Sequence, residues 1–167
     1  PYILSMALYA KNPDAIAQGH ELFTANQAQL VALPADIRMF VLENEVKHFG
    51  NADLFDQLLK AYTQTTDSSY KADILAALTS TTDPTQIAKL VDKFEDADTI
   101  KPQDLRSWFR GVLNNHAGEQ AAWDWLRNEW QWLEKTVGGD MEFTTYITVI
   151  AGVFRTPERL TEFKAFF

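Results

Sequence analysis

The sequence predicts an all-α fold, an α-solenoid of HEAT- or armadillo-like helical hairpins, and three observations support this. Apolar residues recur at the three- and four-residue spacing of amphipathic helices along almost the whole chain. The alternation of apolar and polar residues that marks a half-buried strand is absent from the sequence, and the few Gly and Pro residues stand at junctions. A two-helix pattern also repeats at intervals of 32 to 38 residues, the length of one α-solenoid unit.

The expected helices follow one another from the first residues onward. Residues 2–9 are apolar from their start and match the last turns of a helix that stops before Asn12-Pro13. Nine further helices are expected at residues 13–30, 35–48, 52–64, 68–80, 84–95, 102–114, 118–136, 141–153 and 157–166.

Helix boundaries carry their own signals. Asp83 and Thr156 each place a side-chain acceptor at an N-cap before a proline, whose missing N–H costs nothing at the first helical position. Asn51 and Asp67 can cap the helices that follow them in the same way. We expect Gly50 and Gly138-Gly139 to supply permissive backbone where helices end. The boundary residues named here are thus either polar or glycine.

The repeat emerges when helix starts are aligned. Starts at Asn51, Asp83, Gly118 and Thr156 are 32, 35 and 38 residues apart. Four and seven positions after each start the residues are apolar: Phe55 and Leu58, Ile87 and Leu90, Ala122 and Trp125, Leu160 and Phe163. A hairpin of this kind cannot bury its apolar face alone, so we expect stacked neighbours to share one continuous core. An irregular helical bundle is the alternative.

Length and composition restrict the class of protein. The 167 residues suffice for one domain, expected over residues 1–167, and its hydrophobic content of 46% excludes a disordered chain. A formal charge of −8 argues against a nucleic-acid partner, because affinity for phosphates rests on basic groups. Without cysteine there is no disulfide framework, and without a long apolar stretch we expect no membrane partner.

The two ends indicate a piece of a longer protein. The first residue is Pro, an apolar segment follows at once, and the last residues are Phe166 and Phe167. Such ends fray unless they are docked. We therefore expect an excised fragment, and a processed chain with docked termini is the alternative.

Residues with the potential for chemistry do not form a recognisable motif. His20-Glu21 begins like the zinc motif H-E-x-x-H, but Thr24 stands where the second histidine is required. Neither a G-x-S-x-G elbow nor a glycine-rich phosphate loop is present in the sequence. We predict no catalytic residue and no metal ligand in this chain. An independent hydrolase remains open only if the fold brings distant carboxylates together.

Tryptophans and arginines are the candidates for contacts. Trp123, Leu126, Trp130, Leu133 and Val137 form one helical stripe, and a second stripe on the same predicted helix carries Trp125 and Trp132. This second stripe either packs inside the stack or makes an interdomain contact. Arginines that line a groove would suit a peptide carboxylate, and the candidates are Arg38, Arg106, Arg110, Arg127, Arg155 and Arg159. No single residue is assigned to substrate binding.

Five segments stand in a characteristic order along the chain: residues 33–38, 70–78, 100–104, 122–133 and 154–160. In this order they resemble the C-terminal helical domain of zinc aminopeptidases of the aminopeptidase N and endoplasmic-reticulum aminopeptidase family. The resemblance covers about residues 13–167 and is strongest in Ala122-Trp123-Asp124-Trp125 with Trp130 and Leu133, close to the family's "A-W-x-F … N-W-x-x-L". The other matching segments are residues 33–38, 70–78, 100–104 and 154–160. Lys71, Glu129 and Trp125 depart from the family pattern, which puts local packing in question.

The resemblance implies that this chain is an accessory domain of a longer zinc-dependent peptidase, here called the parent enzyme. In the family a separate domain carries the zinc ligands, and the C-terminal domain caps the active-site chamber and contacts peptide substrate. The implied partners are the remaining domains of the parent enzyme and a peptide. The fragment by itself should hold no zinc and be inactive.

Two further expectations stand beside this one. Acidic charge and missing cysteines favour a cytoplasmic location. A free-standing helical-repeat scaffold that binds a protein or peptide in its groove is the alternative function, because fold alone does not decide function.

Overall fold

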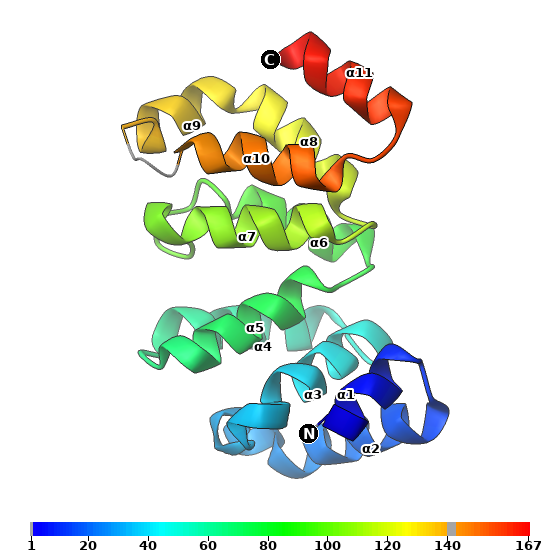
Figure 1. Cartoon of the computed structure of the whole chain (residues 1–167). Coiled ribbons are helices and arrows are strands. Elements are labelled where there is room, and N and C mark those ends of the chain that lie inside the picture. The colour runs from blue at the N-terminus through cyan, green and yellow to red at the C-terminus, as the bar shows by residue number, and fades with distance from the viewer. Residues whose placement is uncertain (1, 140–142) are drawn as a thin grey trace. The chain divides into compact units, whose positions relative to one another are not determined.

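The computed structural model describes residues 2–139 and 143–167, and it confirms the all-α prediction. Within those residues there are eleven α-helices, one 3-10 helix and no strand (Figure 1). The chain divides into two compact units, residues 1–86 and 87–167. The prediction of a single domain over residues 1–167 stays a prediction.

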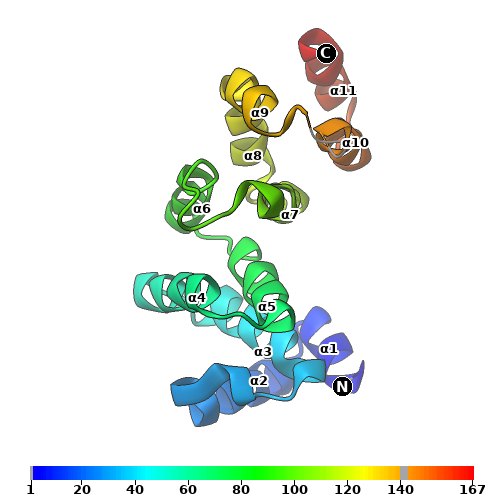
Figure 2. The ribbon, with the colours of Figure 1, turned by 90° about the vertical axis from the view of Figure 1, so that its left-hand side faces the viewer.

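The first unit contains five α-helices, the 3-10 helix and the start of a sixth α-helix. They are α1 (Tyr2–Tyr9), α2 (Pro13–Asn26), η1 (Gln27–Ala32), α3 (Ala35–His48), α4 (Ala52–Gln64), α5 (Ser68–Thr79) and α6 (Pro84–Asp92). Helix α3 packs on α2 and on α5, and α4 packs on α5, as Figures 1 and 2 show. The core between these helices includes Val41, Leu42, Leu58, Ile74 and Leu78, all fully buried.

The second unit contains the rest of α6 and five further helices. They are α7 (Pro102–Asn114), α8 (Glu119–Asn128), α9 (Trp130–Val137), α10 (Phe143–Val153) and α11 (Pro157–Phe166). Helix α7 packs on α8 and α10, and α9 packs on α7 and α8. Its fully buried side chains include Leu105, Trp108, Phe109, Trp123 and Leu133.

Two predicted helices are in fact interrupted. The segment expected at residues 13–30 ends at Asn26, and η1 follows with Gln29 outside helical geometry (φ −149°, ψ 66°). Leu30 and Leu33, in and directly after η1, are both buried. The segment expected at 118–136 breaks at Glu129 (φ −104°, ψ 18°), so each of the two tryptophan stripes is divided between α8 and α9.

Four predicted N-caps are confirmed. Asn51 Oδ1 accepts from the backbone N–H of Leu54 at 2.9 Å, and Asp67 Oδ1 accepts from two N–H groups at the start of α5. Asp83 and Thr156 act in the same way on α6 and α11. The helix expected from residue 141 is observed from Phe143, and its first two expected residues lie outside the described part.

The glycines mark helix ends for a reason other than a left-handed backbone. A positive φ occurs at no described glycine, and Lys11 instead adopts φ 54° in the turn after α1. A Cβ added at Gly50 would lie 2.4 Å from the carbonyl oxygen of Val46, so only glycine fits there. The close approach of backbone to backbone, and not φ, therefore requires glycine at this end of α3.

The aligned apolar positions of the repeat are buried in three of the four hairpins. Phe55, Leu58, Ile87, Leu90, Ala122 and Trp125 are each at most 8% exposed. Leu160 is an exception, because its side chain is 50% exposed on α11, where the described residues leave its face open. The expectation that Leu160 belongs to the core is wrong.

Candidate functional site

Trp125 and Trp132, the predicted interdomain contacts, lie edge to face with ring centroids 6.2 Å apart. Trp125 is only 7% exposed; its ring packs against Phe94 at 4.9 Å, and its Nε1 donates to Glu95 Oε1 at 3.1 Å. Most of the Trp125 side chain is thus used inside the second unit. Trp132 is half-buried, so the interdomain contact stays a prediction that rests mainly on Trp132.

Arg38 is buried in an ion pair and lines no groove. Its Nε donates to Asp73 Oδ2 at 2.6 Å, and its other nitrogens donate to the Val31 carbonyl oxygen and to Ser69 Oγ. The guanidinium also lies over the ring of Tyr70, 5.1 Å from its centroid. Burial raises the pKa of Tyr70, and the positive charge of Arg38 opposes that shift. No signal in the sequence identified Asp73 as the partner of Arg38.

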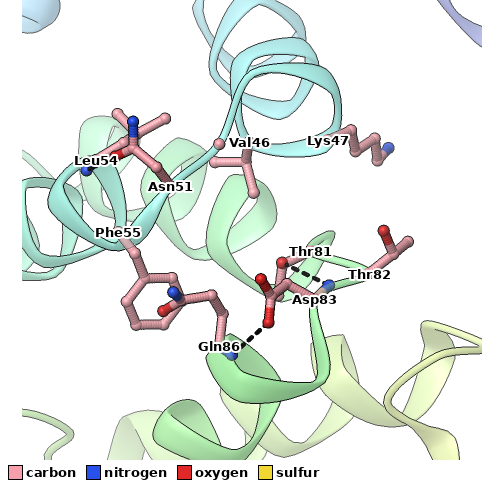
Figure 3. Close-up of a pocket in the computed structure, with 10 residues that line it drawn as sticks. Val46, Lys47, Asn51, Leu54, Phe55, Thr81, Thr82, Asp83 and Gln86 are labelled. Carbon is pink, nitrogen blue, oxygen red and sulfur yellow. Dashed lines mark hydrogen bonds between the residues drawn. The ribbon is translucent and has the colours of Figure 1, made fainter.

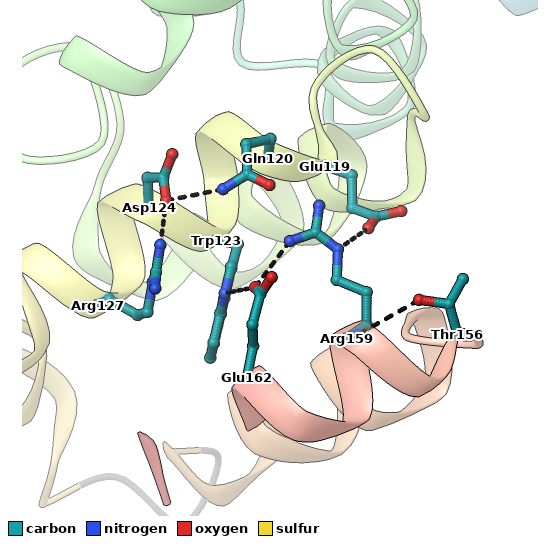
Figure 4. Close-up of polar contacts among 8 residues, drawn as sticks. All are labelled: Glu119, Gln120, Trp123, Asp124, Arg127, Thr156, Arg159 and Glu162. Carbon is teal, nitrogen blue, oxygen red and sulfur yellow. Dashed lines mark hydrogen bonds and ion pairs between the residues drawn. The ribbon is translucent and has the colours of Figure 1, made fainter. Parts of the chain in front are cut away.

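Arg159 ties α11 to α8 through the network in Figure 4. Its Nε donates to Glu119 Oε1 at 2.9 Å and its Nη1 to Glu162 Oε2 at 2.9 Å. The same Glu162 oxygen accepts from Trp123 Nε1 at 2.9 Å. Every residue drawn in Figure 4 makes a polar contact with another residue drawn there, and the Arg159, Glu119, Glu162 and Trp123 contacts link α11 to α8.

The remaining candidate arginines are distributed over the second unit. Arg127 pairs with Asp124 one turn earlier on α8 and lies over the Trp123 ring. Arg106 is half-buried, whereas Arg110 and Arg155 are exposed. The structure therefore does not gather the predicted arginines into one carboxylate site.

The histidines show no metal geometry. His20 Nδ1 is 2.9 Å from Glu45 Oε2, its ring stacks on Phe49 with centroids 4.0 Å apart, and Thr24 Oγ1 donates to the His20 carbonyl oxygen. Within residues 2–139 and 143–167 there is no cluster of three or more His, Cys, Asp or Glu residues that fits a metal ion. The described residues thus offer no fit for the zinc that the family resemblance implies for the parent enzyme.

A small pocket in the first unit is a candidate site for a ligand. It has a volume of about 100 Å³ and lies where α3 ends and where α4 and α6 begin (Figure 3). Asp83, Thr81 and Gln86 face Val46 across it. The full lining is Val46, Lys47, Gly50, Asn51, Leu54, Phe55, Thr81, Thr82, Asp83 and Gln86. The sequence analysis treated Asp83 and Asn51 only as caps, and no sequence signal pointed to Gln86.

The comparison with known proteins identifies the family of this chain. The model of the ERAP1-like C-terminal domain matches residues 1–167, the whole of this sequence. The chain belongs to the ERAP1-like C-terminal domain family. This confirms the resemblance to the C-terminal domain of the aminopeptidase N family, and it accounts for the order of the matching segments.

Curated relatives carry aminopeptidase names. Aminopeptidase N of Lactobacillus helveticus is 60% identical over the whole chain, which covers 20% of that relative. Aminopeptidase N of Lactobacillus delbrueckii subsp. lactis is 53% identical with the same coverage, and glutamyl aminopeptidase of Bos taurus is 26% identical over 99% of the chain. The chain spans about one fifth of the length of these bacterial relatives.

None of the described helices is long and apolar enough to span a bilayer.

Proposed function

We propose that this chain is the C-terminal accessory domain of a zinc-dependent aminopeptidase, which it helps by capping the active-site chamber and contacting the peptide. The observation that carries the proposal is the match of the whole chain to one fifth of enzymes named aminopeptidase N. Peptide-bond hydrolysis would take place in another domain of the parent enzyme, on zinc bound there. A free-standing scaffold is less well supported, because these relatives are much longer than the chain.

The packing of each unit supports a HEAT-like solenoid as the form of this domain. Helix α3 packs on α2, its neighbour in sequence, and on α5, two α-helices later. Helix α7 likewise packs on α8 and on α10, which is the second helix along when α8 and α9 are counted as one helix interrupted at Glu129. Contacts between sequence neighbours and between next-nearest helices are typical of stacked hairpins, in which each unit completes the core of the next.

The partners in this proposal are the other domains of the parent enzyme and its peptide substrate. Trp132, with Trp125 beneath it, is the proposed interdomain contact, because a half-buried aromatic ring offers a large apolar surface. Binding remote parts of a peptide would help to position its first peptide bond. A cytoplasmic location is part of the proposal and rests on the acidic composition without cysteine.

Activity measurements on three proteins test the proposal. We expect the purified chain with added zinc to show no turnover of an aminoacyl chromogenic substrate, and the parent enzyme to be active. Removing residues 1–167 from the parent enzyme should lower kcat/KM for a peptide of several residues more than for a single aminoacyl substrate. Turnover by the repurified chain, or an equal loss on both substrates, would contradict the proposal.

A further inference from the structure

The pocket of Figure 3 contains a carboxylate oxygen that is available to a ligand. Asp83 Oδ1 accepts the backbone N–H groups of Thr85 at 2.7 Å and Gln86 at 3.3 Å, as the N-cap of α6. Its second oxygen, Oδ2, has no hydrogen-bond partner among the residues that the structure describes. The Oδ2 atom of the Asp83 carboxylate can therefore accept a hydrogen bond from a donor that enters the pocket.

The second acceptor is a buried carbonyl. The Gln86 side chain is 7% exposed and lines the pocket beside Phe55, as Figure 3 shows. Its Oε1 finds no donor within the described part of the chain. A buried carbonyl oxygen without a donor is costly, and native proteins satisfy such atoms with protein, water or ligand donors.

The charges around the pocket favour a cation. Val46 and Lys47 belong to the last turn of α3, whose carbonyl groups form the negative end of the helix dipole. The Lys47 ammonium is held 3.0 Å from Glu43 Oε2 and extends away from Asp83 in Figure 3. The positive ends of α4 and α6 also border the pocket, but each is already met by its own cap, Asn51 or Asp83.

We propose that this pocket binds the guanidinium or ammonium head group of a basic side chain, with Asp83 Oδ2 and Gln86 Oε1 as acceptors. A volume of about 100 Å³ has room for a head group of a few heavy atoms. The first unit as a whole attracts cations, because residues 1–86 carry ten Asp and Glu residues against five Lys and Arg residues. The basic side chain comes either from a peptide or from another segment of the parent enzyme.

A titration of this chain with N-acetyl-arginine amide tests the proposal. This probe carries the guanidinium and no free α-amine, so its binding does not depend on the proposed peptidase function. Amide resonances of Thr81, Asp83, Gln86 and Val46 should shift saturably in two-dimensional NMR spectra. N-acetyl-citrulline amide, which has the same shape without the charge, should bind at least about tenfold more weakly.

A matched pair of variants isolates the carboxylate. Asp83→Asn keeps an N-cap residue and removes the charge, so α6 should stay folded while affinity for the arginine probe falls about tenfold. Asp67→Asn makes the same change at the N-cap of α5, outside the pocket, and should leave the affinity unchanged. Equal affinities of the two variants, equal binding of both probes, or tighter binding of N-acetyl-aspartate amide would overturn the proposal.

The parent enzyme distinguishes the two sources of the basic side chain. If a peptide supplies it, the arginine probe should bind the parent enzyme as well as this chain. If a segment of the parent enzyme already fills the pocket, the probe should bind this chain and not the parent enzyme. Both outcomes support the ligand chemistry, and absence of binding to both proteins refutes it.

Discussion

Arg38 shows how a single residue can look functional in the sequence and serve stability in the fold. Its side chain is 4% exposed and that of its partner Asp73 is 12% exposed, so both charges are removed from water. Arg38 lies in the matching segment 33–38 and Asp73 in the matching segment 70–78. Two of the five segments that carry the family resemblance are therefore joined by a buried ion pair between α3 and α5.

Replacing Arg38 alone should destabilise the chain strongly. Arg38→Ala leaves the Asp73 carboxylate buried without its partner, and we expect the free energy of unfolding to fall by about 3–5 kcal/mol. Urea denaturation followed by circular dichroism measures this change. The double variant Arg38→Met/Asp73→Leu removes both charges and should recover most of the loss.

An exposed ion pair provides the control for that experiment. Lys47 and Glu43 form a pair on the surface of α3, with side chains 41% and 26% exposed. Lys47→Ala should lower the free energy of unfolding by less than about 1 kcal/mol. A similar loss for Arg38→Ala and Lys47→Ala would show that burial does not increase the cost of removing one partner of the Arg38–Asp73 pair.

Asp96 provides a prediction about pH at the residue scale. Its carboxylate accepts from Lys93 Nζ and Thr99 Oγ1, both at 2.9 Å, and from the backbone N–H of Asp98. These hydrogen bonds, of which the one from Lys93 has the largest effect, lower the pKa of Asp96 from 3.8 to about 2. Because the pKa in the folded state is depressed, its stabilising effect is complete above pH 3.8 and is lost as the pH falls through about 2.

Carbon-13 NMR of the side-chain carboxyl groups measures this pKa directly. The Asp96 resonance should titrate with a midpoint near 2, and Lys93→Ala should move the midpoint up towards 3.8. A midpoint that is the same in both proteins would show that the Lys93 ammonium does not hold the proton off Asp96.

At the scale of elements, α11 depends on its cap more than the other helices do. The structure gives α11 no fully buried residue, although Arg159 and Glu162 link it to α8. Thr156 Oγ1 accepts the backbone N–H of Arg159 and closes the first turn. With little buried apolar surface to hold the helix, a lost cap should appear as local opening of α11.

Thr156→Ala should therefore reduce hydrogen-exchange protection in α11 without a matching change in α7. The expected loss is about 0.5–2 kcal/mol in local opening free energy. Thr156→Ser keeps the hydroxyl acceptor and should retain the protection. Identical exchange in the alanine and serine variants would show that the cap does not stabilise α11.

At the scale of the whole molecule, α1 leaves an apolar face uncovered. Ile3, Met6 and Tyr9 are 86%, 71% and 91% exposed, while other α1 side chains face α2 and α3. Exposed apolar side chains gathered on one helix favour association. We expect the purified chain to self-associate at high concentration, and the triple serine variant at these positions to weaken that association about tenfold or more.

Sedimentation velocity at several concentrations measures the association. Serine substitutions at Gln57, Lys60 and Gln64, which are exposed on α4, serve as the control and should leave it unchanged. If the α4 variant and the α1 variant associate equally, the apolar face of α1 is not the surface involved.

The order of five matching segments along the sequence indicated the family. The sequence by itself also determined the all-α class and the N-caps. These features depend on local patterns: apolar spacing of three and four residues, and Asn51, Asp67, Asp83 and Thr156 placed just before helices. Each pattern acts within about one helical turn, so it can be recognised in the order of residues alone.

Only the tertiary structure decided which polar groups meet. Arg38 and Asp73 are 35 residues apart, Trp123 and Glu162 are 39 apart, and the pocket joins the end of α3 to the start of α6. The structure also revealed the helix breaks after Asn26 and at Glu129, beyond which Leu30 and Leu133 are buried. Contacts between distant residues depend on how the helices pack. The hydrophobic effect is not directional, so the spacing of apolar residues along a helix does not specify which other helix it packs against.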